Sequence, residues 1–289
     1  MTGISTEDHY SNHSAASYDS GFFTSNEDYL RYLTALIHEK FEWRTNGNDA
    51  SMTMPTSLTL LDIGGGTGSF TKRLIDEFSS LNAIVMEPFL EPNNNVDKSN
   101  DEISNISFCK ASADDFMRED NIMPKDDDMP IWCKGYHHVL MKEMIHHITE
   151  SNRSDIFRAI YTNFQTLQFH HDGAAALIII TRPKYDIDYP LWPAAKNIWE
   201  VNQPDHEGII QDLEAAGFQK VGMSTHAFPC RVNMERWKSM VKGRFWSTFS
   251  SFTDAELHEA CKIYDEHPRL DKDGNLGFED RLLFITAYL

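Results

Sequence analysis

Between about residues 28 and 220 the chain alternates short apolar runs with segments of helical periodicity. Such alternation is typical of strand–helix–strand units that build a parallel sheet. The apolar runs predict strands at 58–63, 83–86, 106–110, 136–141, 174–181, 221–228 and 276–289, and the helical spacing predicts helices at 28–41, 70–78, 154–167 and 205–216. We therefore expect an α/β fold with a seven-stranded, mostly parallel sheet and helices on both of its faces.

One long segment interrupts this alternation before the last predicted strand. Residues 233–275 are rich in aromatic side chains at helical spacing, and an insertion of this size at the edge of a sheet suggests a lid. We predict four regions: an N-terminal helical cap at 1–50, a core at 51–232, a helical lid at 233–275 and the last core strand at 276–289.

Composition and charge restrict the class of partner. The 289 residues carry a net charge of −18, with 41% hydrophobic side chains, enough to fill a core. A phosphate backbone repels so acidic a surface, so we expect small-molecule partners rather than nucleic acid. The longest apolar run, 174–180, is far below the roughly 20 residues that span a bilayer, and the start of the chain lacks a signal pattern. We expect a cytoplasmic monomer or homodimer without a membrane partner.

The strongest chemical signal is a glycine-rich turn that follows the first predicted strand. Asp62 lies near the end of that strand, and Gly64, Gly66 and Gly68 follow before a helical segment. Glycines let a backbone approach a ligand where any Cβ would collide, and a helix N-terminus favours an anionic group. Glu87 ends the next strand, where an acid can accept hydrogen bonds from a ribose. Neither the NAD fingerprint nor a P-loop fits this spacing.

In this motif order, from about residue 28 to 228, the chain resembles class I S-adenosylmethionine-dependent methyltransferases, whose sheet is Rossmann-like. The resemblance implies S-adenosyl-L-methionine as the cofactor. It also implies that the glycines pass the methionine part of the cofactor, that Asp62 lies near its amino group and that Glu87 binds its ribose. Three further residues fall where the family contacts adenine, and one leaves the fourth strand over the cofactor; these are Ser112, Ala113, Asp114 and Lys142.

Histidines provide the candidates for proton chemistry. Methyl transfer needs a base only when the nucleophile carries a proton, and neutral imidazole titrates near working pH. His147, with His146 beside it, is our candidate base or substrate contact. Because neighbouring helical residues point apart, we expect at least one of the two to pack against the sheet instead. The resemblance implies a partner tyrosine from the N-terminal cap, for which Tyr18 is the first candidate and Tyr10 the second.

Cationic and aromatic residues after the fifth strand provide candidates for acceptor binding. Arg182 follows that strand and could hold a carboxylate, as could Arg244 in the lid, although a surface arginine is an equally simple interpretation of Arg182. Tryptophan faces can attract a cationic acceptor or product, and they also serve as core packing. The three candidates are Trp192, Trp199 and Trp246.

The spacing of histidines and acids does not favour a metal site, because no H-E-x-x-H unit is present and residues 271–275 lack the glycine position of a calcium loop. We therefore predict an S-adenosylmethionine-dependent enzyme that methylates sulfur or nitrogen of a small carboxylate-bearing metabolite, for example a methylthio-hydroxy acid or an amino acid. O-methylation of a small acid or phenol is the alternative reaction. A non-catalytic cofactor-binding protein that acts through partners is the alternative from another class.

Overall fold

The computed structural model describes residues 22–41, 58–78, 81–89, 105–117, 135–167 and 175–289. The described chain forms two compact units. The core unit contains the described parts of Leu33–Thr181, together with Glu207–Ser224 and Phe284–Leu289, and the aromatic unit contains residues 22–32, Arg182–His206 and Thr225–Leu283. Within the described residues, no helix is both long and apolar enough to cross a membrane.

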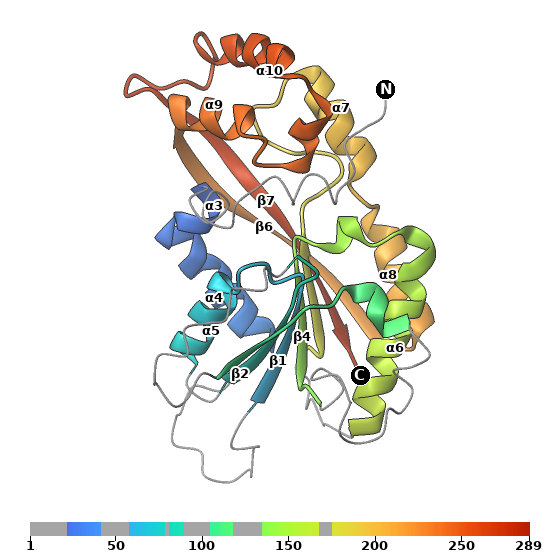
Figure 1. Cartoon of the computed structure of the whole chain (residues 1–289). Helices are drawn as coiled ribbons and strands as arrows, with labels where there is room; N and C mark the ends of the chain where they lie inside the picture. The colour runs from blue at the N-terminus through green and yellow to red at the C-terminus, as the bar shows by residue number, and fades with distance from the viewer. Residues whose placement is uncertain (1–21, 42–57, 79–80, 90–104, 118–134, 168–174) are drawn as a thin grey trace. The chain divides into compact units, whose positions relative to one another are not determined.

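A seven-stranded sheet in the order β3-β2-β1-β4-β5-β7-β6 organises the fold (Figure 1). Neighbours from β3 to β5 pair in parallel, with Leu61 opposite Ile84 on β2 and Val139 on β4. The order of the strands reverses between β1 and β4, and ligands of open α/β sheets bind at the carboxyl ends of the strands at such a point. The strands are β1 (Leu58–Ile63), β2 (Leu81–Met86), β3 (Ile106–Cys109), β4 (His138–Lys142), β5 (Leu177–Thr181), β6 (Lys220–Asn233) and β7 (Asn275–Tyr288).

Helices cover both faces of the sheet in the core unit, as Figure 1 shows. Alternate residues of β1 determine which face each one meets, because strand side chains alternate between the two faces. Leu61 and Ile63 are buried in one cluster with Phe157 and Leu213, whereas Asp62 faces α5. The helical elements of this unit are the end of α4 (Glu27–Phe41), α5 (Ser69–Glu77), η1 (Ala113–Met117), η4 (Ile145–His147), α6 (Glu150–Leu167) and α8 (His206–Ala216).

His137, the residue before β4, pairs with the backbone of Thr59. The His137 N–H donates to Thr59 O at 2.8 Å, and the Thr59 N–H donates to His137 Nδ1 at 2.9 Å. The ring of His137 therefore extends the pairing of β1 with β4 by one hydrogen bond, for which its Nδ1 must be unprotonated. Burial lowers the pKa of His137, which favours that neutral form.

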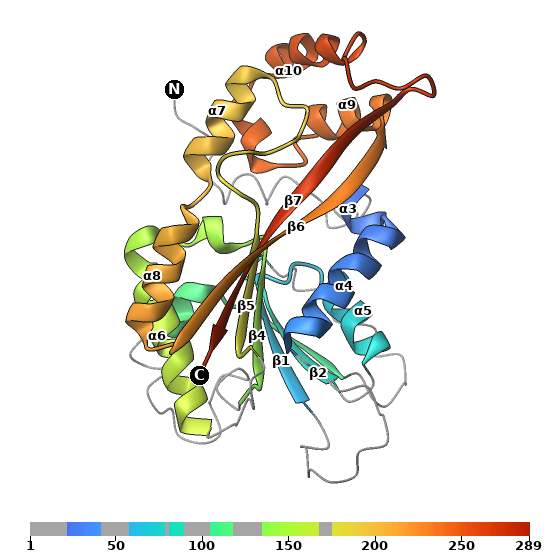
Figure 2. The same cartoon turned by 180° about the vertical axis from the view of Figure 1, so that it is seen from behind.

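Helices and aromatic side chains dominate the aromatic unit, which also contains residues 225–233 of β6 and 275–283 of β7 (Figure 2). Trp237 is buried on α9 and lies 5.2 Å from Phe278 of β7 between ring centroids. Thr253 forms a capping box with Glu256 at the start of α10. The helical elements are α3 (Phe22–Ser25), α7 (Pro193–Asn202), α9 (Met234–Lys242), η5 (Ser247–Ser251), α10 (Asp254–Ala260) and η6 (Cys261–Tyr264).

The predicted sheet and its flanking helices are confirmed, with β1 at the predicted residues and the other strand ends shifted. The strand expected at 221–228 continues to Asn233, through Pro229, which an edge strand tolerates because it needs no inward N–H there. The predicted helix at 205–216 ends as expected at Gly217, which has a φ of 117°. The helical elements α9, η5, α10 and η6 lie within the segment whose pattern predicts helices, while its role as a lid stays a prediction.

Candidate functional site

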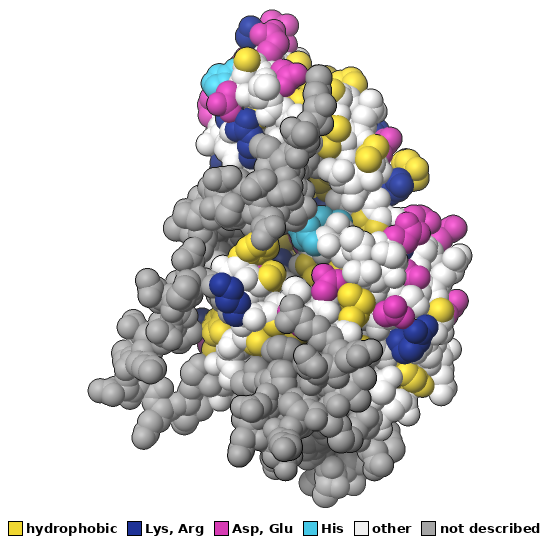
Figure 3. Space-filling view, turned by 45° about the vertical axis from the view of Figure 1, so that its right-hand side comes forward, with side chains coloured by type: hydrophobic (Ala, Val, Ile, Leu, Met, Phe, Trp, Pro, Cys, Tyr) yellow, Lys and Arg dark blue, Asp and Glu magenta, His cyan; other side chains and the backbone are white. Residues whose placement is uncertain are grey.

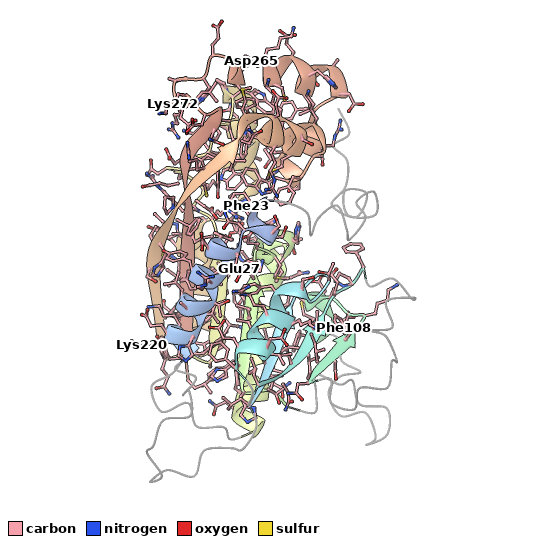
Figure 4. The ribbon with its side chains drawn as sticks, turned by 90° about the vertical axis from the view of Figure 1, so that its left-hand side faces the viewer. Phe23, Glu27, Phe108, Lys220, Asp265 and Lys272 are labelled. Carbon is pink, nitrogen blue, oxygen red and sulfur yellow. The ribbon has the colours of Figure 1, made fainter. Side chains whose placement is uncertain are left out.

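The turn between β1 and α5 is built from glycines with positive φ. The φ angles of Gly64, Gly66 and Gly68 are 72°, 58° and 75°. A Cβ at Gly64 would lie 2.8 Å from Met144 Cβ, and one at Gly68 would lie 2.7 Å from the ring of Phe108, which is labelled in Figure 4. At Gly66 a Cβ would meet no described atom within 4 Å. Gly66 is therefore where the turn offers bare backbone to a ligand, whereas Gly64 and Gly68 serve packing within the protein.

Asp62 lies beneath this turn with one oxygen satisfied and one not. Its carboxyl group is 2% exposed, and Thr71 of α5 donates a hydrogen bond to Oδ2. Among the described residues, Oδ1 has no hydrogen-bond partner. Burial raises the pKa of Asp62 to about 6, against the opposing effects of Thr71 and the Lys142 ammonium. Because buried polar groups are normally paired, the unsatisfied oxygen indicates a place for a donor supplied by a ligand.

Glu87 connects the end of β2 to the glycine turn. Its Oε2 accepts a hydrogen bond from the Gly66 N–H at 3.1 Å, and Oε1 accepts one from the Phe89 N–H at 3.1 Å. Burial is the main cause that raises its pKa. Each carboxylate oxygen keeps a further acceptor position, so Glu87 can brace the turn and still accept a hydrogen bond from a ligand hydroxyl.

The predicted adenine-contacting residues lie at the start of η1, after β3. Asp115 accepts hydrogen bonds from the Ser112 N–H at 2.7 Å and from its hydroxyl at 3.2 Å, which caps the short helix. Asn152 of α6 donates to Asp114 at 3.0 Å, and Ala113 is buried. The sequence analysis missed Asp115, although a serine followed three residues later by an acid is a typical helix-start pattern.

Lys142 and Met144 extend the site from the carboxyl end of β4. The Lys142 ammonium lies 5.3 Å from the centroid of the Phe70 ring and lowers the pKa of Asp62. Met144 packs over Gly64 as described above. The predicted cofactor-binding residues of β1, β2 and β4 therefore lie around one glycine turn.

His146 and His147 lie in η4, immediately after this segment. Their ring centroids are only 4.0 Å apart, so the expectation that the two side chains point apart is wrong. The pair belongs to a three-residue 3₁₀ turn, where the spacing of a longer α-helix does not apply and both rings can turn together. Burial, and then the neighbouring His146, lower the pKa of His147 to about 3. His147 is therefore neutral at physiological pH and a weak proton acceptor.

Arg182 lies inside the aromatic unit, in an ion pair that the sequence analysis did not predict. Its Nε donates to Asp280 Oδ1 at 2.9 Å and its Nη2 to Oδ2 at 3.3 Å, and the Tyr189 hydroxyl bonds to both groups. The guanidinium is 6% exposed and faces the ring of Phe23 at 5.2 Å, a residue labelled in Figure 4. The interpretation of Arg182 as a surface residue is therefore wrong, because its charge is paired and surrounded by rings.

The alternation of apolar and polar residues along β7 could have indicated that Asp280 is buried. Leu276, Phe278 and Leu282 are buried at every second position, and Asp280 occupies the remaining inward position of that series. An acid at an inward strand position requires a cationic partner. The alternation alone does not say which arginine supplies it.

The other predicted acceptor-binding residues in the aromatic unit also have protein partners. Trp199 is 3% exposed and donates to Pro183 O at 3.1 Å, and the ring of Trp192 stacks on Phe249. Trp246 lies 5.7 Å from the Arg182 guanidinium. Arg244 pairs with Asp254 at 2.8 Å. The remaining candidates, Tyr10 and Tyr18, lie outside the described residues.

Comparisons with known proteins place this geometry in a fold class. No family model matches the chain, and no curated protein is similar to it in sequence. In three dimensions the chain is similar to a putative methyltransferase from an antibiotic biosynthesis pathway of Anabaena variabilis, with a TM-score of 0.50 and 13% identity over 90% of this chain and 97% of that chain. The chain has the class I methyltransferase fold.

Two further solved structures are similar to the chain with lower TM-scores. The YcgJ protein of Bacillus subtilis has a TM-score of 0.48 and 12% identity, and the match covers 89% of this chain and 97% of that chain. The phosphoethanolamine N-methyltransferase 2 of Haemonchus contortus, solved with S-adenosyl-L-methionine, has a TM-score of 0.44 and 13% identity over 96% of this chain. This match covers 60% of the Haemonchus chain.

Proposed function

We propose that the chain transfers the methyl group of S-adenosylmethionine to a small-molecule acceptor. The observation that carries this proposal is the unsatisfied, buried Oδ1 of Asp62, whose carboxyl group lies against Gly65, next to the open backbone position of Gly66. A carboxylate in that environment needs a cationic or N–H donor, which the amino group of the cofactor's methionine part can provide. Glu87, on the same turn, retains acceptor positions for ribose hydroxyls. The residues present therefore fit the cofactor.

Each proposed contact has a distinct task. Asp62 would hold the cofactor's ammonium, and the nearby Lys142 charge favours the ionised carboxylate that this requires. Ser112, Ala113 and Asp114 would line the adenine end. When bound, S-adenosylmethionine supplies an electrophilic methyl group on a sulfonium. The protein then has to align a nucleophile and exclude water, and alignment alone can contribute about 7–11 kcal/mol to lowering the barrier.

For the acceptor atom we propose sulfur or nitrogen. A thioether sulfur or a neutral amine attacks a methyl group without first losing a proton. His147, with its pKa lowered to about 3, is a poor acceptor for a proton and suits a hydrogen-bonding role beside such a nucleophile. An alcohol or phenol would demand more of this histidine, which is why O-methylation stays the alternative reaction.

A carboxylate on the acceptor is the most demanding part of the proposal. Arg182 and Arg244 are its candidate ligands, and each already pairs with an aspartate, Asp280 or Asp254. Either arginine would have to accept a second anionic partner beside the first. The rings of Trp192 and Trp246, both partly exposed, would face a cationic amine or sulfonium product.

Calorimetry and product analysis test the function together. Purified protein is titrated with S-adenosylhomocysteine and with NAD, and is then incubated with methyl-labelled S-adenosylmethionine and a fractionated extract of small metabolites. We expect S-adenosylhomocysteine to bind, NAD not to bind, and one fraction to yield a labelled product whose mass spectrum gives the acceptor atom. An absence of S-adenosylhomocysteine binding would overturn the proposal.

The same experiment separates the alternatives. Binding of S-adenosylhomocysteine without transfer to any fraction would favour the non-catalytic, partner-directed protein. Among transferring enzymes, His147→Gln distinguishes the acceptor atoms. We expect this variant to change the acceptor KM more than kcat for sulfur or nitrogen methylation, and to lower kcat steeply for O-methylation.

A further inference from the structure

A strained residue lies at the carboxyl end of β4, next to the glycine turn. Glu143 has a φ of 56°. The left-handed region disfavours residues with a Cβ, and a glutamate lacks the short side chain that lets asparagine or aspartate bond locally there. In the described part of the core unit, no other residue except glycine has a positive φ. Such strain persists only where the surrounding structure holds it, and it gathers at sites that need a fixed geometry.

One backbone hydrogen bond holds Glu143 and another holds Met144, the residue that follows it. Its N–H donates to Ile180 O at 2.7 Å, which continues the pairing of β4 with β5 one residue beyond Lys142. The chain then reverses into η4, where the His147 N–H donates to Met144 O at 2.9 Å. Glu143 and Met144 thus form the two-residue connection between an extended strand and a 3₁₀ turn.

This reversal brings Met144 against the glycine turn. The Cβ, Cγ and Cε atoms of Met144 lie 2.8, 3.0 and 3.5 Å from the position that a Cβ on Gly64 would take. Met144 therefore covers the first glycine of the turn. The opposite end of the turn rests on Phe108, so that the open backbone at Gly66 lies between two packed glycines.

We propose that Glu143 is a positioning residue that acts through its backbone: its left-handed conformation seats Met144 on Gly64 and so fixes the glycine turn in its binding shape before any ligand arrives. The proposal rests on the cofactor role proposed for this turn. The carboxylate of Glu143 is not the acting group. Residues that tolerate positive φ should therefore replace it, and residues that resist positive φ should not.

Four variants separate backbone from side chain. Glu143→Gly and Glu143→Asn accept the left-handed conformation, Glu143→Gln keeps the strain but removes the charge, and the β-branched Glu143→Val resists the conformation. We expect the first three to bind S-adenosylhomocysteine within about threefold of the parent, and Glu143→Val to bind about tenfold more weakly or worse. Met144→Ala should weaken binding in the same way. Asp186 in the aromatic unit has a comparable φ of 58°, and valine resists that conformation as well. Asp186→Val is therefore the matched control and should leave this affinity unchanged.

Hydrogen exchange in the ligand-free protein provides a readout that a merely structural role would not produce. The amides of Gly66 and Gly68 are hydrogen-bonded, to Glu87 and to Gly65 O. We expect Glu143→Val to speed exchange at these two amides more than at the β1 amides paired with β2, whereas general destabilisation would speed all of them alike. If Glu143→Val does not fold, Glu143→Ala takes its place.

Several outcomes would overturn the proposal. Equal loss of binding in Glu143→Gln and Glu143→Val would assign the role to the carboxylate, and parent-like exchange and affinity in Glu143→Val would remove the role altogether. If the parent protein itself fails to bind S-adenosylhomocysteine, the proposed function fails, while the exchange of the Gly66 and Gly68 amides still decides whether Glu143 shapes the turn.

Discussion

Two buried acids, Asp62 in the core unit and Asp280 in the aromatic unit, differ in how their charge is compensated. In the core unit Asp62 is buried with one oxygen unpaired, and its pKa is raised to about 6. In the aromatic unit Arg182 and Asp280 are just as buried, yet they pair with each other and with the Tyr189 hydroxyl, and the guanidinium also lies over nearby rings. A buried charge whose partners all come from the protein is part of the fold. A buried charge that lacks a partner destabilises the empty protein and indicates where a ligand completes it.

Charged side chains at the surface are shown for one face in Figure 3. Among the described side chains on the face shown, Lys and Arg stand in separate small groups, interspersed with Asp and Glu. Ion pairs at exposed positions contribute little to stability, usually about 0–1 kcal/mol each. The contrast that matters for function is therefore between the two buried groups.

The largest effect should come from splitting the ion pair of the aromatic unit. Arg182→Met leaves the carboxylate of Asp280 buried without its charge partner, and we expect the free energy of unfolding to fall by about 3–5 kcal/mol. The double variant Arg182→Met/Asp280→Leu removes both charges and should recover most of that loss. Equilibrium urea unfolding, followed by circular dichroism, measures both.

The double variant also tests whether Arg182 has a second role. If the arginine only stabilises the fold, the recovered protein should keep the parent acceptor KM. A large increase in that KM in a stable double variant would show that Arg182 also binds substrate. A loss below about 1 kcal/mol in Arg182→Met would contradict the comparison itself, since exposed pairs have such values.

Asp62→Asn should raise the free energy of unfolding, whereas Arg182→Met lowers it. The raised pKa means that the folded state holds its proton more tightly than the unfolded state, so ionisation costs stability as pH rises from about 4 to about 6. A shift of 3.8 to about 6 corresponds to at most about 3 kcal/mol. We expect Asp62→Asn to be about 1–3 kcal/mol more stable than the parent at pH 7 and to lose this advantage near pH 4.

The same variant, although more stable, should bind S-adenosylhomocysteine more weakly. An amide cannot replace a carboxylate opposite an ammonium, so we expect the Kd for S-adenosylhomocysteine to rise roughly ten- to a hundredfold. Thermal or urea unfolding at two pH values and calorimetry provide the measurements. A variant that is less stable at pH 7 and binds normally would show that Oδ1 does not serve the ligand.

The sequence and the structure agree best where one local pattern decides the outcome. The strand at 58–63 is a continuous apolar run that leads into glycines, and it appears at the predicted residues. Helix α7 was not predicted, although it begins at Pro193 and a proline is favourable at the first position of a helix. Local pattern therefore fixes the elements more reliably than it fixes their ends.

Partners that are distant in sequence mark where prediction from sequence stops. The cofactor candidates Asp62 and Glu87 were predicted from the glycine-rich motif, from an acid at the end of the second strand and from the resemblance to a methyltransferase family. The pairing of Arg182 with Asp280, 98 residues away, depends on the position of β7 beside β5, which no local pattern specifies. The left-handed conformation of Glu143 depends on the tertiary packing around it and has no local signal either.

Two glycines of the turn, Gly64 and Gly66, should differ in whether their substitution affects stability or binding. Gly66→Ala and Gly64→Ala both place a Cβ at positive φ, which costs roughly 1–2 kcal/mol each. Only Gly64→Ala also collides with Met144, so we expect it to lower the free energy of unfolding more than Gly66→Ala does. Gly66→Ala should instead lose S-adenosylhomocysteine binding from a nearly intact fold. Equal stability of the two variants would mean that Met144 moves aside easily.

The smallest effect concerns His137, a half-buried neutral side chain of the core unit that accepts a backbone hydrogen bond. His137 Nδ1 accepts the Thr59 N–H, and burial lowers the pKa of His137 below that of the unfolded chain. The unfolded state therefore takes up the proton first, and stability is lost as pH falls below about 6.5. The loss at this site should be about 1 kcal/mol, the value of one hydrogen bond. His137→Asn keeps an acceptor that does not titrate, so its Thr59 amide should exchange at the same intrinsic-corrected rate at pH 7.5 and pH 5.5. In the parent that corrected rate should rise at pH 5.5, and a parent that matched the variant would show that His137 stays unprotonated in the folded protein at pH 5.5 and does not make the fold sensitive to this change of pH.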